Sequence, residues 1–441
     1  MGYILNKDQM DIVNLAKDYA VKKVMPLVPE LDNAPELTPE TEEGKKLLDL
    51  YQGAVDLGLT TLEIPEEYGG LGQDYYTVAA AYEELSKVDA GFATAVAASS
   101  LGLKPILQHG NDEQKKLYAD FLNGEKTSEK APVPGFCAFC LTEPDAGSDA
   151  SNSKTTAKKV GDEYIIDGTK CFITNGGVAS VYTVFAVTDK TKGVKGISAF
   201  IVERDREGVS IGAEENKMGI RLSNTTEVIF QDVHIPADHL VGEEGKGFIY
   251  AMQTLDLARP MIGALAVGIA QRGIDEAVKY AQVRQTFGKP IIKHEAIAFK
   301  LADMDIQTEV GRSSIINFLN KYYDERKNGR YNYSREAAIC KCFCGDMCVQ
   351  VALDAIQILG GFGYSREYPV EKLVRDAKIM SYHFLHAHNI TYYVNNCTIV
   401  RPEKEGELAS GKGRRPGRTV GRSSWVVRRR LFVVGRWSFI A

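Results

Sequence analysis

In the chain of 441 residues no uncharged, strongly apolar run approaches the about 20 residues of a membrane-spanning helix, so we expect no membrane span. It has eight cysteines, too few for a disulfide scaffold in so long a chain. Charged residues make up 25% and apolar types 44%, which excludes disordered and low-complexity classes. No signal or transit peptide pattern opens the sequence. We therefore expect a cytoplasmic protein of about two to four domains.

Two nucleotide-binding signatures are also missing. The chain has no G-x-x-x-x-G-K-[ST] loop and no G-x-G-x-x-G that follows a strand and opens a helix. The Gly-Gly-Phe-Gly run at 360–363 follows a helical pattern, which is the wrong context for a dinucleotide fold. We expect neither P-loop chemistry nor a Rossmann site.

Cysteines cluster between Cys340 and Cys348 with C-x-C-x-C-x3-C spacing, and Cys137 and Cys140 form a C-x-x-C pair. A structural metal site draws its ligands together in tetrahedral geometry. The first cluster instead lies in a helical pattern over 334–359, where residues i and i+2 point to different sides. We predict small buried core cysteines and no metal site.

Charge is distributed unevenly along the chain. From Arg401 onward there are eleven basic and three acidic residues, a charge of +8. Because the net charge is −5, residues 1–400 sum to −13. Both tryptophans, Trp425 and Trp437, lie in this basic tail. A shifted reading frame, a misjoined exon or an assembly error accounts for the tail. A tail that binds nucleic acid nonspecifically is the alternative, although no nucleic-acid-binding motif is present and we expect no nucleic-acid partner.

Periodicity changes twice along the sequence. Helical patterns run from Lys7 to about residue 122, and a polar stretch at 126–134 with two prolines reads as a linker. Strand-like runs punctuated by Asp167-Gly168 and Asn175-Gly176 turns follow, at residues 164–166, 170–174, 181–187, 197–202 and 227–230. Five or more strands without intervening helices predict an antiparallel barrel or sandwich.

After residue 247 the helical period returns. A stripe spaced 4, 3, 4, 3, 4, 3, 4 predicts a long bundle helix, with Ile297, Leu301, Met304, Thr308, Gly311, Ile315, Phe318 and Tyr322 on its buried face. The predicted fold is a multi-domain, mainly α, α+β protein: an N-terminal α-helical domain (1–133), a middle antiparallel β-barrel or sandwich domain (134–247), a C-terminal four-helix bundle (248–395) and a basic, poorly ordered tail (396–441).

Two polar segments interrupt these patterns. Cys-Leu-Thr-Glu-Pro-Asp-Ala-Gly-Ser-Asp at 140–149 offers hydroxyls and backbone N–H groups to a polar ligand, and an ordinary surface turn is the alternative. Gln-Ile-Leu-Gly-Gly-Phe-Gly-Tyr at 357–364, with Glu367, Lys372 and Asp376 behind it, allows close backbone approach, and a helix C-cap is the alternative.

These two segments resemble the acyl-CoA dehydrogenase family, together with Lys-Cys-Phe-Ile-Thr-Asn-Gly-Gly at 170–177 and Arg-Gln-Thr-Phe-Gly-Lys at 284–289. The resemblance runs from about residue 5 to residue 380. It implies the family's three-domain fold, FAD as cofactor, an acyl-CoA substrate, electron-transfer flavoprotein as partner, a homotetramer and a place in fatty acid metabolism.

The resemblance also assigns cofactor residues. Thr142 and Thr174 would hydrogen-bond the flavin edge and tune its electron demand, and Arg284, reaching over from a neighbouring subunit, would pair with the pyrophosphate. The implied FAD residues are Phe139, Leu141, Thr142, Gly147, Ser148, Phe172, Ile173, Thr174, Arg284, Thr286, Phe287, Gln357, Gly360 and Gly361.

The implied reaction is α,β-dehydrogenation of an acyl-CoA thioester to trans-2-enoyl-CoA, with a short or medium chain as the family-level expectation. Ser148 would touch the acyl-CoA, and Asp256 and Arg259 would lie by the acyl and pantetheine channel. A buried carboxylate would take the α-proton while the β-hydrogen leaves as hydride to the flavin. An acyl-CoA oxidase or flavin monooxygenase on the same fold, and a non-catalytic flavin- or CoA-binding remnant, are the alternatives.

The sequence departs from the family at this base. Ungapped counting puts Phe384 where the family has its glutamate, and Ala258 stands at the alternative position used by some relatives. The Gly-Thr that follows that glutamate is also missing. His383 is a candidate replacement base, and a metal site of His383, His386 and His388 is an alternative without carboxylates around it. The catalytic residue is therefore unknown.

Overall fold

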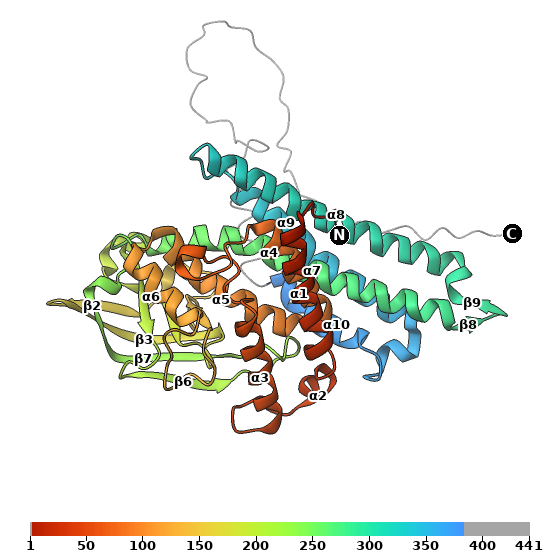
Figure 1. Ribbon diagram of the computed structural model, residues 1–441, viewed down its shortest axis with the longest axis horizontal. Helices are drawn as coiled ribbons and strands as arrows, with labels where there is room; N and C mark the ends of the chain where they lie inside the picture. The colour runs from red at the N-terminus through yellow and green to blue at the C-terminus, as the bar shows by residue number, and fades with distance from the viewer. Residues whose placement is uncertain (1, 383–441) are drawn as a thin grey trace, which may run out of the picture. The chain divides into compact units, whose positions relative to one another are not determined.

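Capped helices form the first 122 residues of the computed structural model, which describes residues 2–382 (Figure 1). Asn6 with Gln9, and Asn111 with Gln114, make reciprocal capping boxes that satisfy the first N–H groups of α1 and α6. The helices are α1 (Lys7–Tyr19), a π-helical turn (Ala20–Val24), α2 (Val28–Asn33), α3 (Glu42–Asp56), α4 (Tyr75–Val88), α5 (Ala90–His109) and α6 (Asp112–Leu122).

One seven-stranded sheet follows, in the order β1-β4-β2-β3-β7-β6 with β5 paired to β4. Its strands are β1 (Cys137–Cys140), β2 (Thr156–Val160), β3 (Glu163–Thr174), β4 (Val181–Val187), β5 (Ile197–Glu203), β6 (Val209–Glu214) and β7 (Thr225–Pro236). Most pairings are antiparallel, as predicted, but β4 runs parallel to β1 and, at one residue pair, to β2. The chain between β1 and β4 is long enough to make that parallel return.

The predicted turn at Asp167-Gly168 is wrong, because β3 continues through it. A shift of register against β7 lies between Ile166 and Gly168, so the extra residue is accommodated as a β-bulge. Gly168 has a φ of 150°, and a Cβ there would lie 2.4 Å from the Thr155 hydroxyl. The glycine thus serves a close approach between strands, whereas Asn175-Gly176 is a turn at the end of β3.

The C-terminal region is a helical bundle. Every stripe residue from Leu301 to Tyr322 is buried along α8, and Ile297 packs at its edge, which confirms the predicted core face. The elements are α7 (Gly247–Val283), the short strands β8 (Gln285–Thr286) and β9 (Lys289–Pro290), α8 (Glu295–Lys327), α9 (Ser334–Leu359), a 3₁₀ segment (Gly360–Tyr364) and α10 (Val370–Tyr382).

The cysteines of α9 pack in this bundle. Cys340, Cys344 and Cys348 are buried and Cys342 is half-buried, while Cys137 and Cys140 are buried in β1. Within residues 2–382 no group of three or more His, Cys, Asp or Glu is arranged to hold a metal ion.

Two helices in the described part of the chain are long and apolar enough to cross a membrane by composition alone, α5 and the segment Ser334–Tyr364. In α5, 89% of the most apolar window is buried inside the protein, as in the core helix of a globular domain. α5 packs against α4, α7 and β1, and therefore joins the sheet to the bundle. The helix–sheet–helix order confirms the predicted fold class; the basic tail lies outside the described residues.

Candidate active site

A cavity of about 770 Å³ lies where α5, the sheet, α7 and α10 meet. Its walls come from all three regions of the chain. α5 contributes six residues between Thr94 and Lys104, and β1 with its following loop contributes six between Phe139 and Ala150. β3 contributes 172–174, and the loop after β6 contributes 215–220. The remaining described lining residues are Tyr82, Thr225, Leu255, Ala258, Met261, Ile262, Arg375, Lys378, Ile379 and Tyr382.

The wall formed by the sheet holds eight of the predicted FAD residues: Phe139, Leu141, Thr142, Gly147, Ser148, Phe172, Ile173 and Thr174. β3 bulges between Lys170 and Ile173, which gives Phe172 a φ of 53° and leaves 66% of its surface exposed. A large aromatic ring exposed by a strained backbone at a cavity wall offers a planar ligand a stacking surface.

Unpartnered hydroxyls stand beside this ring. The backbone N–H of Cys171 donates to the carbonyl of Thr142 at 3.0 Å, which holds the loop after β1 against β3. Among the described residues, the side-chain hydroxyls of Thr142, Ser148 and Thr174 have no hydrogen-bond partner. An aromatic face with free hydroxyl groups suits the flavin ring, whose edge both donates and accepts hydrogen bonds, so the wall fits FAD.

Glu143 anchors the loop beneath this wall and is unsuited to act as a base. Its carboxylate accepts from Lys170 Nζ at 2.7 Å, from the Lys154 N–H at 2.6 Å and from Ser153. Although burial opposes it, the Lys170 charge and these hydrogen bonds lower the pKa of Glu143 to about 2. Burial in turn lowers the pKa of Lys170, so part of the ion-pair energy offsets desolvation.

The wall that α5 forms carries a buried ion pair that sequence reasoning missed. Lys104 lines the cavity and donates to both carboxylate oxygens of Glu63, at 2.7 and 2.6 Å, and to Ser100. Only 3% and 4% of the two charged side chains are exposed. The Tyr75 ring lies 5.3 Å from Lys104 Nζ. The signal in the sequence was a single lysine that ends the uncharged run at 90–103.

α7 presents one face to the cavity and another to α9. Leu255, Ala258, Met261 and Ile262 line the cavity, while Asp256 is paired with Arg259 and accepts from Ser334 of α9. Asp256 and Arg259 are buried and are not among the described lining residues. Burial raises the pKa of Asp256 despite its arginine partner.

The other predicted FAD residues lie at the far end of the bundle. Arg284, Phe287, Gln357, Gly360 and Gly361 are exposed, and 96% of the Phe287 side chain is open. Thr286 bonds His294 at 3.0 Å. β8 and β9 lie at the end of the bundle opposite the sheet (Figure 1). One copy of the chain therefore does not bring the two groups together.

Base candidates are sparse in the described part of the cavity. Ala258 is 6% exposed and offers no proton acceptor, and Glu215 is the one carboxylate among the described lining residues. Phe384 and the three histidines from His383 to His388 lie outside the described residues.

Comparison with known proteins gives the class. Three family models match in order: the acyl-CoA dehydrogenase N-terminal domain at residues 6–125, the middle domain at 138–233 and the C-terminal domain at 245–383. The chain belongs to the acyl-CoA dehydrogenase family, which is FAD-dependent.

Named relatives and solved structures are similar to this chain over most of its length. A short-chain-specific acyl-CoA dehydrogenase of Megasphaera elsdenii is 43% identical over 86% of this chain and 94% of its own length. The structure of butyryl-CoA dehydrogenase from that organism matches with a TM-score of 0.80 and 40% identity, over 90% of this chain and 99% of that one. A structure described as electron transferring flavoprotein of Acidaminococcus fermentans matches with a TM-score of 0.81 and 39% identity, over 90% and 99%.

We expect Glu143 to stabilise the fold in a pH-dependent way. Its native pKa of about 2 lies below the ordinary 4.5, so its contribution is present above pH 4.5 and is lost as the pH falls toward 2. Glu143→Gln should lower the free energy of unfolding at pH 7 by about 3–5 kcal/mol, because it leaves Lys170 buried beside a neutral group. In urea denaturation series, the variant's free energy of unfolding should also fall less between pH 4.5 and pH 2 than that of the unmodified chain.

Asp145→Asn is the control for this experiment, since Asp145 pairs with Lys154 at the surface. If Glu143→Gln lost as much stability between pH 4.5 and pH 2 as the unmodified chain, the pH-dependent role of Glu143 would be contradicted.

Proposed function

We propose that this chain binds FAD and a short-chain acyl-CoA in the cavity and serves α,β-dehydrogenation, with electrons passed to an electron-transfer flavoprotein. The observation that carries the proposal is the cavity itself, which places an aromatic, hydroxyl-bearing wall opposite the apolar face of α7. Bound FAD supplies the two-electron acceptor. Phe172 and the hydroxyls of Thr142 and Thr174 hold and orient it, and Ser148 contacts the acyl-CoA.

The Lys104–Glu63 pair favours a short acyl chain. Both charges are buried and satisfied by one another and by Ser100, so displacing them would leave an unpaired charge in the interior. A longer saturated chain would have to bury methylene groups against this charged part of the wall. The two relatives from Megasphaera elsdenii are a short-chain-specific and a butyryl-CoA enzyme.

Among the described residues that line the cavity, Glu215 is the one carboxylate and position 258 holds an alanine, which favours a non-catalytic flavin- and CoA-binding role as the second candidate. The α-proton of a thioester is too weakly acidic to leave without a positioned acceptor, and Ala258 cannot accept it.

Assembly is part of the proposal, as a homotetramer or at least a dimer. The exposed group around Arg284 and the cavity group around Phe172 must come from different copies to hold one FAD. Apolar side chains also form an exposed stripe on α8, at Phe299, Ile306 and Val310. A second copy covering this stripe would supply the missing group.

We expect Ala258→Glu to accelerate flavin reduction. The new carboxylate enters the cavity from an apolar helix face, where burial raises its pKa toward neutrality. Anaerobic bleaching of bound flavin by butyryl-CoA, at matched FAD occupancy, should be faster by about 10²–10⁴-fold than in the unmodified chain.

Ala258→Gln has the same size without the basic group and should remain slow. Rapid bleaching in the unmodified chain would mean that a base exists elsewhere, and Glu215→Gln and His383→Gln would then identify it.

We expect Lys104→Leu/Glu63→Gln to broaden chain length. The double replacement removes both buried charges and keeps an acceptor for Ser100, so a longer chain gains about 0.8 kcal/mol per buried methylene. In equilibrium titrations, octanoyl-CoA should gain affinity relative to butyryl-CoA. Arg312→Leu/Glu83→Gln is the matched control, because that pair is equally buried but does not line the cavity. An equal change in relative affinity in both variants would contradict the proposal that the Lys104–Glu63 pair limits chain length.

We expect FAD binding to require two copies. Phe172→Asp should disable the cavity group and Arg284→Glu the bundle-end group, so each variant alone should lose FAD. Co-refolded mixtures should regain about a quarter of the sites, since random pairing joins one intact group from each copy. Absorbance in the flavin bands and light scattering measure this. FAD bound to a monomer would contradict the proposal that two copies form the site.

A further inference from the structure

The loop after β6 forms one wall of the cavity, and its backbone is strained at Ile220. Residues 215–220 all line the cavity, and Ile220 is 6% exposed with a φ of 45°. A β-branched residue rarely adopts a positive φ, because its Cβ approaches the following carbonyl oxygen. Contacts from outside the loop must therefore hold Ile220 in this conformation.

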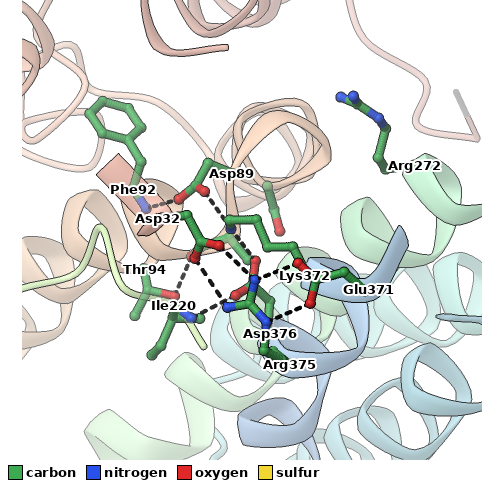
Figure 2. Close-up of polar contacts among 12 residues, drawn as sticks. Asp32, Asp89, Phe92, Thr94, Ile220, Arg272, Glu371, Lys372, Arg375 and Asp376 are labelled. Atoms are coloured by element: carbon green, nitrogen blue, oxygen red, sulfur yellow. Dashed lines mark hydrogen bonds and ion pairs between the residues drawn. The ribbon is translucent and has the colours of Figure 1, made fainter. Parts of the chain in front are cut away.

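α10 supplies those contacts. The Asp376 carboxylate accepts the backbone N–H of Ile220 at 2.6 Å (Figure 2). Arg375 donates to the carbonyl of Met218 at 3.2 Å. A Cβ on Gly219 would lie 2.4 Å from the carbonyl carbon of Arg375, so loop and helix backbones touch there and leave no room for a side chain.

The same carboxylate connects the loop to α5 through Lys372. Lys372 Nζ donates to Asp376 and, at 2.6 Å, to Asp89, whose other oxygen accepts the Phe92 N–H at 2.7 Å and caps α5 (Figure 2). Asp89, Lys372 and Asp376 are buried, with 2%, 7% and 1% of their surface exposed. These three residues are called the α10 clamp below. Despite burial, the two carboxylates raise the pKa of Lys372, so it stays charged.

An outer layer of ion pairs supports the clamp from the N-terminal helices. Arg375 donates to Asp32 of α2 at 2.6 Å and to Glu371 at 2.8 Å. Through these contacts α10 touches α2, the α5 cap and the loop after β6 at once. Three walls of the cavity thus meet at one buried charge cluster.

We propose that Lys372 and Asp376 are positioning residues for ligand binding in this cavity: they fix loop 215–220 and the start of α5 relative to one another. Neither is among the described residues that line the cavity, so they act through Ile220 and through the capped helix. The inference rests on the proposed function in one respect, namely that FAD and acyl-CoA are the ligands.

The first test needs no ligand. In the apoprotein, Asp376→Asn should increase amide hydrogen exchange in the peptide that covers residues 215–224 by about tenfold or more, while α8 peptides stay unchanged. Glu83→Gln is the matched control, since Glu83 is a buried, arginine-paired carboxylate between α4 and α8 that does not line the cavity. Equal exchange of the loop in both variants would overturn the proposal.

The second test measures FAD affinity at a temperature below the unfolding transition of every variant. Asp376→Asn should raise the Kd by about tenfold, whereas Glu83→Gln should leave it unchanged. Glycine adopts a positive φ without strain, so Ile220→Gly should reduce the effect of Asp376→Asn. An undiminished effect in the Ile220→Gly background contradicts strain as the reason for the clamp. If no variant takes up FAD, the proposed function fails. The amide exchange of the apoprotein still tests whether the α10 clamp fixes the loop.

A third comparison remains valid if Asp376→Asn does not fold. Because Ile220 has a positive φ, Ile220→Gly should melt at a higher temperature than Ile220→Ala, although it removes one more carbon. The reverse order would show that the loop is not held in the strained conformation and would overturn the inference.

Discussion

Three buried charges at one junction, Asp89, Lys372 and Asp376, connect the regions of the chain that the cavity requires. A charge in a protein interior is tolerated only with partners, so the three side chains fix one another's positions. Asp89 belongs to the N-terminal helices, the Ile220 N–H to the β region, and Lys372 and Asp376 to the bundle. An apolar contact between these regions would allow sliding. A directional, charge-assisted network allows one arrangement, and the strained Ile220 backbone is stable within that arrangement alone.

Sequence patterns predicted the regular parts of the fold because one physical cause dominated there. The stripe on α8 is a pure burial signal, and its residues from Leu301 to Tyr322 are buried as expected. β1, β2 and β6 were missed because they are short or polar, and their strand conformation comes from pairing with distant strands. Asp167-Gly168 reads as a turn locally, but pairing with β7 overrides that preference. The predicted FAD residues of the sheet region do lie together in the cavity wall, because their two motifs fall at the ends of β1 and β3.

The cavity's other determinants could not be read from the sequence. Lys104 meets Glu63 across 41 positions, and Asp376 meets Ile220 across 156. Neither pair has a local motif, since each depends on how α5 and α10 settle against loops far away in the chain. The exposed group around Arg284 is a different case. Arg284 suits an anion, yet this group lies at the end of the bundle opposite the sheet, so one copy does not join it to the cavity residues.

Helix geometry on α7 separates binding from chemistry in this chain. Successive cavity-facing positions at 255, 258, 261 and 262 follow the helical repeat, so a carboxylate at 258 would enter the cavity. Asp256 lies on another face, held by Arg259 and Ser334, and cannot be turned toward the cavity without breaking a buried ion pair. The cavity walls and the α10 clamp depend on interactions throughout the fold, whereas proton abstraction depends on one side chain. A chain without a proton acceptor at position 258 therefore keeps the architecture of a binding site, and α7 sets where a carboxylate at that position would lie.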